Sequence, residues 1–212
     1  MPKKLPDIEY SEDKNNPVID SKNAFYTLPY FKDNEYFMSY ESYIHFIKGC
    51  EKLVRSNDVY KKYISYLKGE IKLNKCQVLK DVTDDDDVTI EMHHTPFTLF
   101  DICAIVTEYF LYKGWKVSTF RIANQVLREH RENKIGVVML SKTVHEAVHN
   151  GNIVITYPMI YGDLKSFIKK YDKVISNQYR EKINRLIDTS LLRDPDDFGV
   201  LDLNPNIYKK ED

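Results

Sequence analysis

The chain has 212 residues, of which 42% are hydrophobic and 30% charged, and its 31 basic and 32 acidic residues give a net charge of -1. This composition is typical of a globular protein with one substantial core, and it argues against a general electrostatic attraction to nucleic acid or membrane. No apolar run approaches the roughly 20 residues that cross a bilayer. The 3 cysteines are too widely spaced to indicate a disulfide framework or a thiolate zinc site. We therefore expect a cytoplasmic protein.

The first part of the chain divides into an irregular arm and two helices. Scattered prolines without any periodicity predict an irregular arm over residues 1–38. Ser39 is placed to cap a helix that runs past Leu53, and a second helix is expected from about Asp58 to near Gly69. Two β-branched-rich runs, residues 75–82 and 88–94, predict a hairpin.

The rest of the body alternates helices with short strands. We expect an apolar helix that ends before Gly114 and a basic helix capped by Ser118 or Thr119. A buried strand over residues 137–140, a short helix over residues 141–149, a strand over residues 153–157 and an amphipathic helix from about residue 163 to 187 complete the body. The fold class is therefore α+β: a mainly helical single domain over residues 39–190, with a small antiparallel hairpin and a tail over residues 191–212.

Four of the 6 histidines form two close pairs. His145 and His149 are four residues apart on the expected short helix, so both can hold one ion from the same face. His93 and His94 are neighbours on a strand and point to opposite sides, so one of them can complete a three-imidazole site. The other then stays free to take a proton from water.

The residues Glu91-Met92-His93-His94 and His145-x-x-x-His149-x-Gly151 resemble the first and last parts of the HNH, or ββα-metal, nuclease motif. The likeness is closest to the colicin-type bacteriocin DNases. Residues 88–97 and 135–151 are the two motif halves, and residues 98–134 form a helical insertion where many family members have a short loop. The Lys, Asn, Ile and Tyr usage would suit a bacteriophage or low-GC bacterial protein, which would act in the host cytoplasm if it is encoded by a phage.

The resemblance implies a reaction and a role for each matching residue. His93, His145 and His149 would hold one divalent ion, which is Mg, Mn, Zn or Ni, while His94 would be the general base and Glu91 would orient the site. The implied activity is endonucleolytic hydrolysis of phosphodiester bonds in DNA. The family's middle asparagine has no match, since counting back from His145 reaches Gly136, and Asn133 is the nearest candidate for its supporting role.

The position of the basic helix in the chain indicates three candidate substrate-binding residues. The basic helix lies between the motif halves, so Arg121, Arg128 and Arg131 are expected to contact phosphate groups without reading sequence. The structural alternative for this run of charge is a solvated helix face.

Two other functions fit parts of the pattern. His145-Glu146-Ala147-Val148-His149 matches the H-E-x-x-H pattern of zinc metalloproteases, in which the glutamate is the general base. No histidine follows His149, and Thr143 with Glu146 fits a capping box that would occupy the glutamate. The second alternative is a degenerate HNH fold that binds DNA or inhibits an enzyme without cutting.

Overall fold

The computed structural model describes residues 31–79, 82–84 and 88–191. The predicted arm before residue 31 and the tail after residue 191 lie outside the described residues. The α-helices are α1 (Asn34–Met38), α2 (Tyr40–Ser56), α3 (Asp58–Gly69), α4 (Leu99–Tyr112), α5 (Thr119–Arg131), α6 (Lys142–His149), α7 (Leu164–Tyr171) and α8 (Asn177–Leu191). Two short 3-10 turns, η1 (Tyr157–Met159) and η2 (Asp172–Val174), precede and follow α7.

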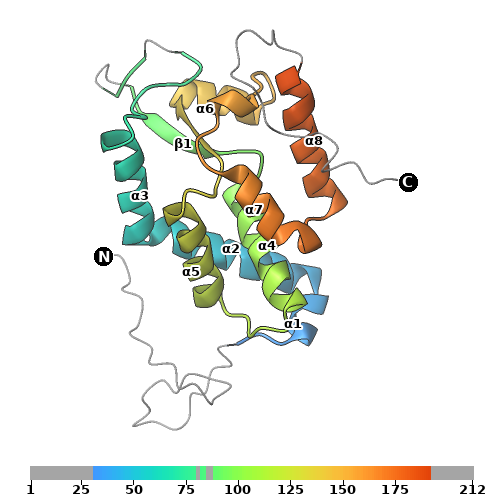
Figure 1. Cartoon of the computed structure of the whole chain (residues 1–212). Coiled ribbons are helices and arrows are strands. Elements are labelled where there is room, and N and C mark those ends of the chain that lie inside the picture. Colours follow the sequence, from blue (N-terminus) through green and yellow to red (C-terminus); the bar gives the residue numbers. More distant parts are fainter. Residues whose placement is uncertain (1–30, 80–81, 85–87, 192–212) are drawn as a thin grey trace.

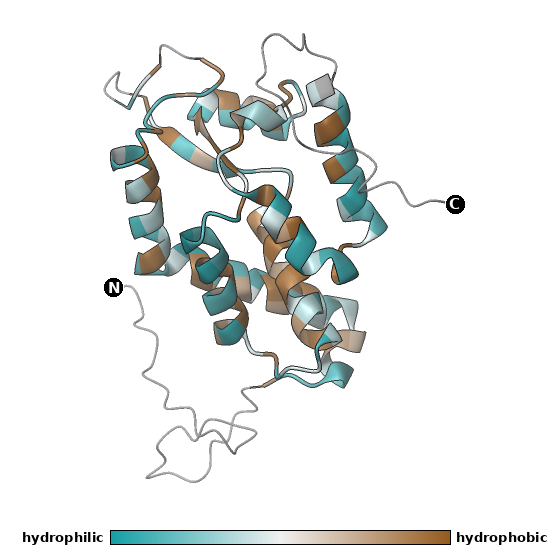
Figure 2. Cartoon of the chain, in the orientation of Figure 1, coloured by the Kyte–Doolittle hydropathy of each residue, from teal (hydrophilic) through white to brown (hydrophobic). Residues whose placement is uncertain are grey.

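The helical body is assembled around α4, which is the most apolar of the helices (Figures 1 and 2). Its side chains are buried through most of its length, and α2, α5 and α7 pack against it. The helix α2 also contacts α3 and α5, so residues far apart in the sequence share one core. The α+β class and the mainly helical body are as predicted.

Local sequence signals set several helix ends. The Ser39 side chain accepts a hydrogen bond from the Ser42 amide at the start of α2, and Ser118 does the same for Arg121 in α5. A capping side chain satisfies an amide that the helix itself leaves unpaired. The Ser39 cap was predicted from the sequence, and Ser118 was one of the two candidates for the second cap.

The strands β1 (Ile90–His94) and β2 (Val137–Ser141) form an antiparallel pair, in which His93 lies opposite Val138. Every residue of β2 is buried, and a second, smaller cluster of apolar side chains packs around this strand. The predicted hairpin is wrong because β1 pairs with a strand that follows two helices. Within residues 75–79 and 82–84, which the structure describes, the earlier run forms only an isolated bridge between Lys75 and Thr83.

Two later expectations also need correction. Residues 153–157 do not form a strand, and only Tyr157 of that run is in a regular element, the turn η1. The single helix expected from residue 163 to 187 is divided into α7 and α8, because η2 and an extended Ile175 intervene. The expected arm contains α1 within residues 31–38.

Candidate metal centre

The strand pair and the following helix bring three histidines together. His93 lies on β1, and α6 begins directly after β2, so His145 and His149 project from the helix beside the strand. The ring centroid of His93 is 4.9 Å from that of His145 and 5.0 Å from that of His149. We call these three residues the histidine cluster.

The cluster has the dimensions of a binding site for one metal ion. Each histidine offers one ring nitrogen, and these nitrogens all lie within 4.8 Å of one another. The Nε2 atoms of His145 and His149 are 3.0 Å apart. In a tetrahedral zinc site with bonds of about 2.0 to 2.1 Å, ligand nitrogens are roughly 3.3 Å apart. The donor set and its spacing therefore fit a divalent transition metal.

Glu91 holds one of the three imidazoles in place. Its Oε2 atom accepts a hydrogen bond of 2.6 Å from Nδ1 of His145. A proton on Nδ1 leaves Nε2 as the nitrogen with a free lone pair, and this is the atom that faces His149. A carboxylate bonded to the far nitrogen of a ligating histidine is the usual support for a metal site.

The cluster is partly open to solvent. His93 and His145 are half-buried and His149 is exposed. Burial, together with repulsion from the charged forms of His145 and His149, lowers the pKa of His93 to about 4. A neutral His93 offers the lone pair that a metal ligand needs.

The structure does not bring His94 to the histidine cluster. Its side chain points to the other side of β1, as strand geometry requires, and it is only 7% exposed. Its Nε2 atom is 3.0 Å from Nε2 of His130 on α5, and the Tyr60 ring on α3 stacks against it. The role of His94 as general base stays a prediction, and the direction of its ring does not support it.

The buried histidine pair, His94 and His130, has a defined pattern of protons. Nδ1 of His130 is 2.8 Å from the Val126 carbonyl oxygen, which can only accept, so His130 carries its proton there. Nε2 of His130 is then an acceptor, and Nε2 of His94 donates to it. Burial lowers the pKa of His130 to about 4 and that of His94 well below its ordinary value, so both rings are neutral near pH 7.

Neither of the two positions considered for the missing asparagine supplies that residue to the histidine cluster. A Cβ atom at Gly136 would lie 2.3 Å from the carbonyl oxygen of Thr95, so an asparagine does not fit there. Asn133 follows α5 with a positive φ of 52°, and its side chain lines a cavity between α3 and α5. Asn133 therefore lies outside the histidine cluster.

The three predicted phosphate-binding arginines differ in their surroundings. Arg121 donates to the Lys116 carbonyl and lies over the Phe110 ring, near the start of α5. Arg128 is paired with Glu132. Arg131 is exposed at the end of α5, next to His130, and within the described residues it has no ion-pair partner. The structure therefore separates Arg131 from the other two.

The geometry of α6 also bears on the metalloprotease alternative. The predicted capping box is wrong, because the residue that caps the helix is Ser141, without a side-chain bond, and both Thr143 and Glu146 are exposed. The third histidine near the pair comes from β1, upstream of the motif, rather than from a downstream segment.

The sequence reasoning missed His130 and Tyr60. A signal for His130 was present, since it lies four residues after the inward-facing Val126 and therefore on the buried side of α5. Tyr60 gave no comparable signal, because only the packing of α3 against β1 and α5 brings its hydroxyl within 3.5 Å of His94.

The fold and the site define an α+β protein with a three-histidine cluster at the junction of two strands and a helix. Residues 3–210 match the model of the bacteriophage G278-like virion protein family, and the chain belongs to this family. The match supports the expected bacteriophage origin and gives no support to the HNH nuclease resemblance. Searches of curated proteins and of solved structures gave no match.

The family description points to the phage particle, whereas the sequence analysis predicted the cytoplasm. None of the helices within the described residues combines the length and apolar character needed to span a membrane.

Proposed function

We propose that this virion protein is a metal-dependent endonuclease that hydrolyses phosphodiester bonds in DNA. The observation that carries the proposal is the convergence of His93, His145 and His149 from one strand and one helix onto a single point. Three imidazoles leave at least one position open on a tetrahedral ion, as catalytic sites require and closed structural sites do not. The order of strand, strand and helix is also that of the motif which the sequence resembles.

The donor set narrows the identity of the ion. Neutral imidazoles suit zinc and nickel, whereas magnesium prefers oxygen ligands, so we rank Zn and Ni above Mn and Mg. An ion held here would polarise a phosphoryl oxygen and make water more acidic. The protein's own contribution is to fix the three nitrogens, through the Glu91 bond to His145 and the pairing of β1 with β2.

Arg131 is the arginine that we assign to the DNA backbone. It is exposed and has no ion pair within the described residues, whereas Arg128 is paired with Glu132. Arg121 lies ten residues earlier on α5, which at 1.5 Å per residue is about 15 Å along the helix. A virion protein is synthesised in the host cytoplasm, so the predicted location is compatible with later incorporation into the particle.

The test is cleavage of supercoiled plasmid by the full chain with each of the four ions. We expect nicking that is abolished by EDTA and by His145→Ala or His149→Ala. His45→Ala is the matched control, because His45 is an exposed histidine on α2. The variant His94→Gln tests the predicted base. If nicking persists, the ion rather than His94 activates the water. If nicking is lost while the ion is still bound, the result supports His94 as the base.

Three results would favour other functions. Binding of an ion without cleavage in any of the four metals would indicate a non-catalytic DNA-binding or inhibitory module. Metal-dependent cleavage of a protein substrate that is lost in Glu146→Gln would indicate the metalloprotease. Plasmid nicking that survives the loss of His145 or His149 would contradict the proposed site.

A further inference from the structure

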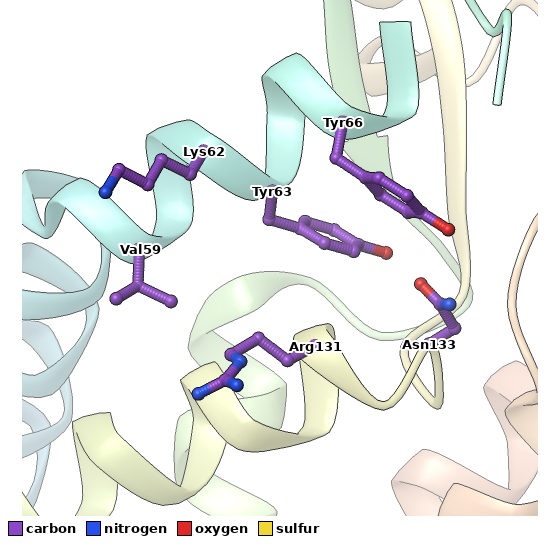
Figure 3. A pocket seen from close by; sticks show the side chains of 6 residues that line it. All are labelled: Val59, Lys62, Tyr63, Tyr66, Arg131 and Asn133. Carbon is purple, nitrogen blue, oxygen red and sulfur yellow. The ribbon is translucent and has the colours of Figure 1, made fainter. Parts of the chain in front are cut away.

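A cavity of about 380 Å³ lies between α3 and α5, apart from the histidine cluster (Figure 3). Its volume is within the range of small-molecule sites. Six residues line it: Val59, Lys62, Tyr63, Tyr66, Arg131 and Asn133. None of them is a member of the histidine cluster or of the buried histidine pair.

Two residues that line one end of the cavity carry buried polar atoms without partners. The hydroxyl of Tyr63 and the side-chain oxygen of Asn133 are buried, and neither has a hydrogen-bond partner among the residues that the structure describes. Figure 3 shows the Tyr63 and Tyr66 rings extending from α3 toward Asn133, whose oxygen faces the tyrosine hydroxyls. Tyr63 is only 5% exposed, and unpaired groups at such depth are uncommon in native proteins. They mark a place where a ligand would complete the hydrogen bonds.

The other end of the cavity is positively charged. Lys62 on α3 and Arg131 on α5 are both exposed and extend toward the side of the cavity near Val59 (Figure 3). No ion pair within the described ranges involves either side chain. Two cations on facing helices without an acidic partner favour an anion, and a guanidinium is well suited to phosphate.

An aromatic ring lies at the Asn133 end of the cavity (Figure 3). Tyr66 is 39% exposed and lines the cavity, so a face of its ring is accessible to a planar group. Nucleobases stack on such rings in many nucleic-acid-binding proteins. Burial raises the pKa of Tyr63, and nearby tyrosines raise it further, so its hydroxyl stays protonated and can donate to a base.

We propose that this cavity binds one nucleotide, with its phosphate between Lys62 and Arg131 and its base against Tyr66. The edge of the base reaches the Tyr63 hydroxyl and the Asn133 carboxamide, which together offer donors and acceptors. The nucleotide is either free or the terminal unit of a strand. The proposal shares Arg131 with the proposed function but does not require a metal ion or any hydrolysis.

The experiment is calorimetric titration of the metal-free full chain in EDTA. The probes are a deoxynucleoside 5′-monophosphate, the matching deoxynucleoside, inorganic phosphate and a 5′-phosphorylated tetranucleotide. We expect the monophosphate to bind more tightly than either the nucleoside or phosphate alone, because only it reaches both ends of the cavity. A tetranucleotide that binds more tightly still would identify a strand end as the source of the ligand.

Two variants locate the site. Arg131→Gln should weaken nucleotide binding about 10-fold or more, because it removes a charged hydrogen-bond donor. Arg128→Gln is the matched control on the same helix, since Arg128 already pairs with Glu132. Tyr63→Phe should weaken binding by up to about 10-fold and preserve the fold, because it removes only the unpaired hydroxyl.

Several results would overturn the proposal. They are the absence of nucleotide binding at millimolar concentration, phosphate that binds as tightly as the nucleotide, and equal affinities of the Arg131→Gln and Arg128→Gln variants. Because the assay contains EDTA and measures no cleavage, its outcome is separate from that of the nuclease test. If Tyr63→Phe failed to fold, the exposed Arg131 would still decide the question.

Discussion

The two faces of β1 carry adjacent histidines into different surroundings. On one face, His93 meets His145 and His149 at a partly open surface, where ring nitrogens face one another and Glu91 supports the group from outside. On the other face, His94 is buried against His130, whose second nitrogen is tied to the backbone of α5. The same residue type thus has two roles: His93 is a candidate metal ligand on one face, and His94 is a buried polar link between β1 and α5 on the other.

The difference shows what decides the role of a histidine. The neighbours of a histidine, rather than its residue type, distinguish a metal ligand from a core residue. The converging nitrogen lone pairs of the histidine cluster require an ion or protons between them, whereas the donor and acceptor of the buried histidine pair satisfy each other. The two faces should therefore respond differently to substitution, to acid and to metal.

The largest effect on stability is expected for His94→Ala. The substitution leaves a cavity and removes the donor to Nε2 of His130, which is fully buried. We expect a loss of about 3 to 4 kcal/mol in the free energy of unfolding, from the cavity and the unpaired nitrogen together. Urea unfolding of the metal-free chain measures this change, and a loss below about 1 kcal/mol would show that the buried pair does not hold β1 to α5.

Acid should weaken the fold through the buried face. Burial sets the pKa of His130 at about 4 in the folded protein, below its ordinary value of 6.5. The contribution of neutral His130 to the free energy of unfolding is therefore fully present above pH 6.5. It is lost as the pH falls from 6.5 toward 4, because the histidine of the unfolded chain takes up a proton at a higher pH than that of the folded protein. The contribution of His130 over this window is on the order of 3 kcal/mol.

Unfolding free energies at pH 7 and pH 4 measure this effect, with His130→Gln as the comparison because glutamine has no such titration. The difference between the two pH values should be smaller in the variant. An equal difference in both proteins would show that His130 is not held neutral by the fold.

Glu91→Gln should affect the open face and leave the buried one unchanged. An amide accepts the Nδ1 proton of His145 less strongly than a carboxylate does, so the histidine becomes a poorer ligand. We expect zinc affinity to fall about 10- to 100-fold, as for other supporting carboxylates. Competition with a chelating dye measures this affinity, and Glu146→Gln on the exposed side of α6 is the control.

The smallest effect is expected for the stability of the metal-free His93→Ala variant. His93 is half-buried and its charged form is repelled by two other histidines, so its removal should change the unfolding free energy by less than about 1 kcal/mol. This change in the free energy of unfolding should be much smaller than that of His94→Ala. Similar losses in both variants would contradict the division of roles across β1.

Local signals predicted the parts of the fold that depend on neighbouring residues. The caps at Ser39 and Ser118, the two inserted helices, and the opposite directions of His93 and His94 follow from short-range geometry. The pairing of β1 did not follow, because its partner is a strand beyond two helices and the nearer run had a similar composition.

The sequence predicted the three histidines of the site but not the surroundings of His94. The i, i+4 spacing placed His145 and His149 together, and the resemblance added His93, so the structure brings the three expected ligands to one point. The surroundings of His94 depended on α5 and α3, which the sequence motif does not describe. The cavity between those helices also arises from tertiary packing alone.

The central claim is that the three imidazoles bind one ion together, and X-ray absorption spectroscopy of the zinc-loaded chain tests it most directly. We predict one zinc ion per chain, with three imidazole nitrogens at about 2.0 to 2.1 Å and a water oxygen in the remaining position. In His145→Ala the zinc should be lost, whereas His45→Ala should give the parent spectrum. Failure to bind zinc, or an unchanged spectrum in His145→Ala, would contradict the account.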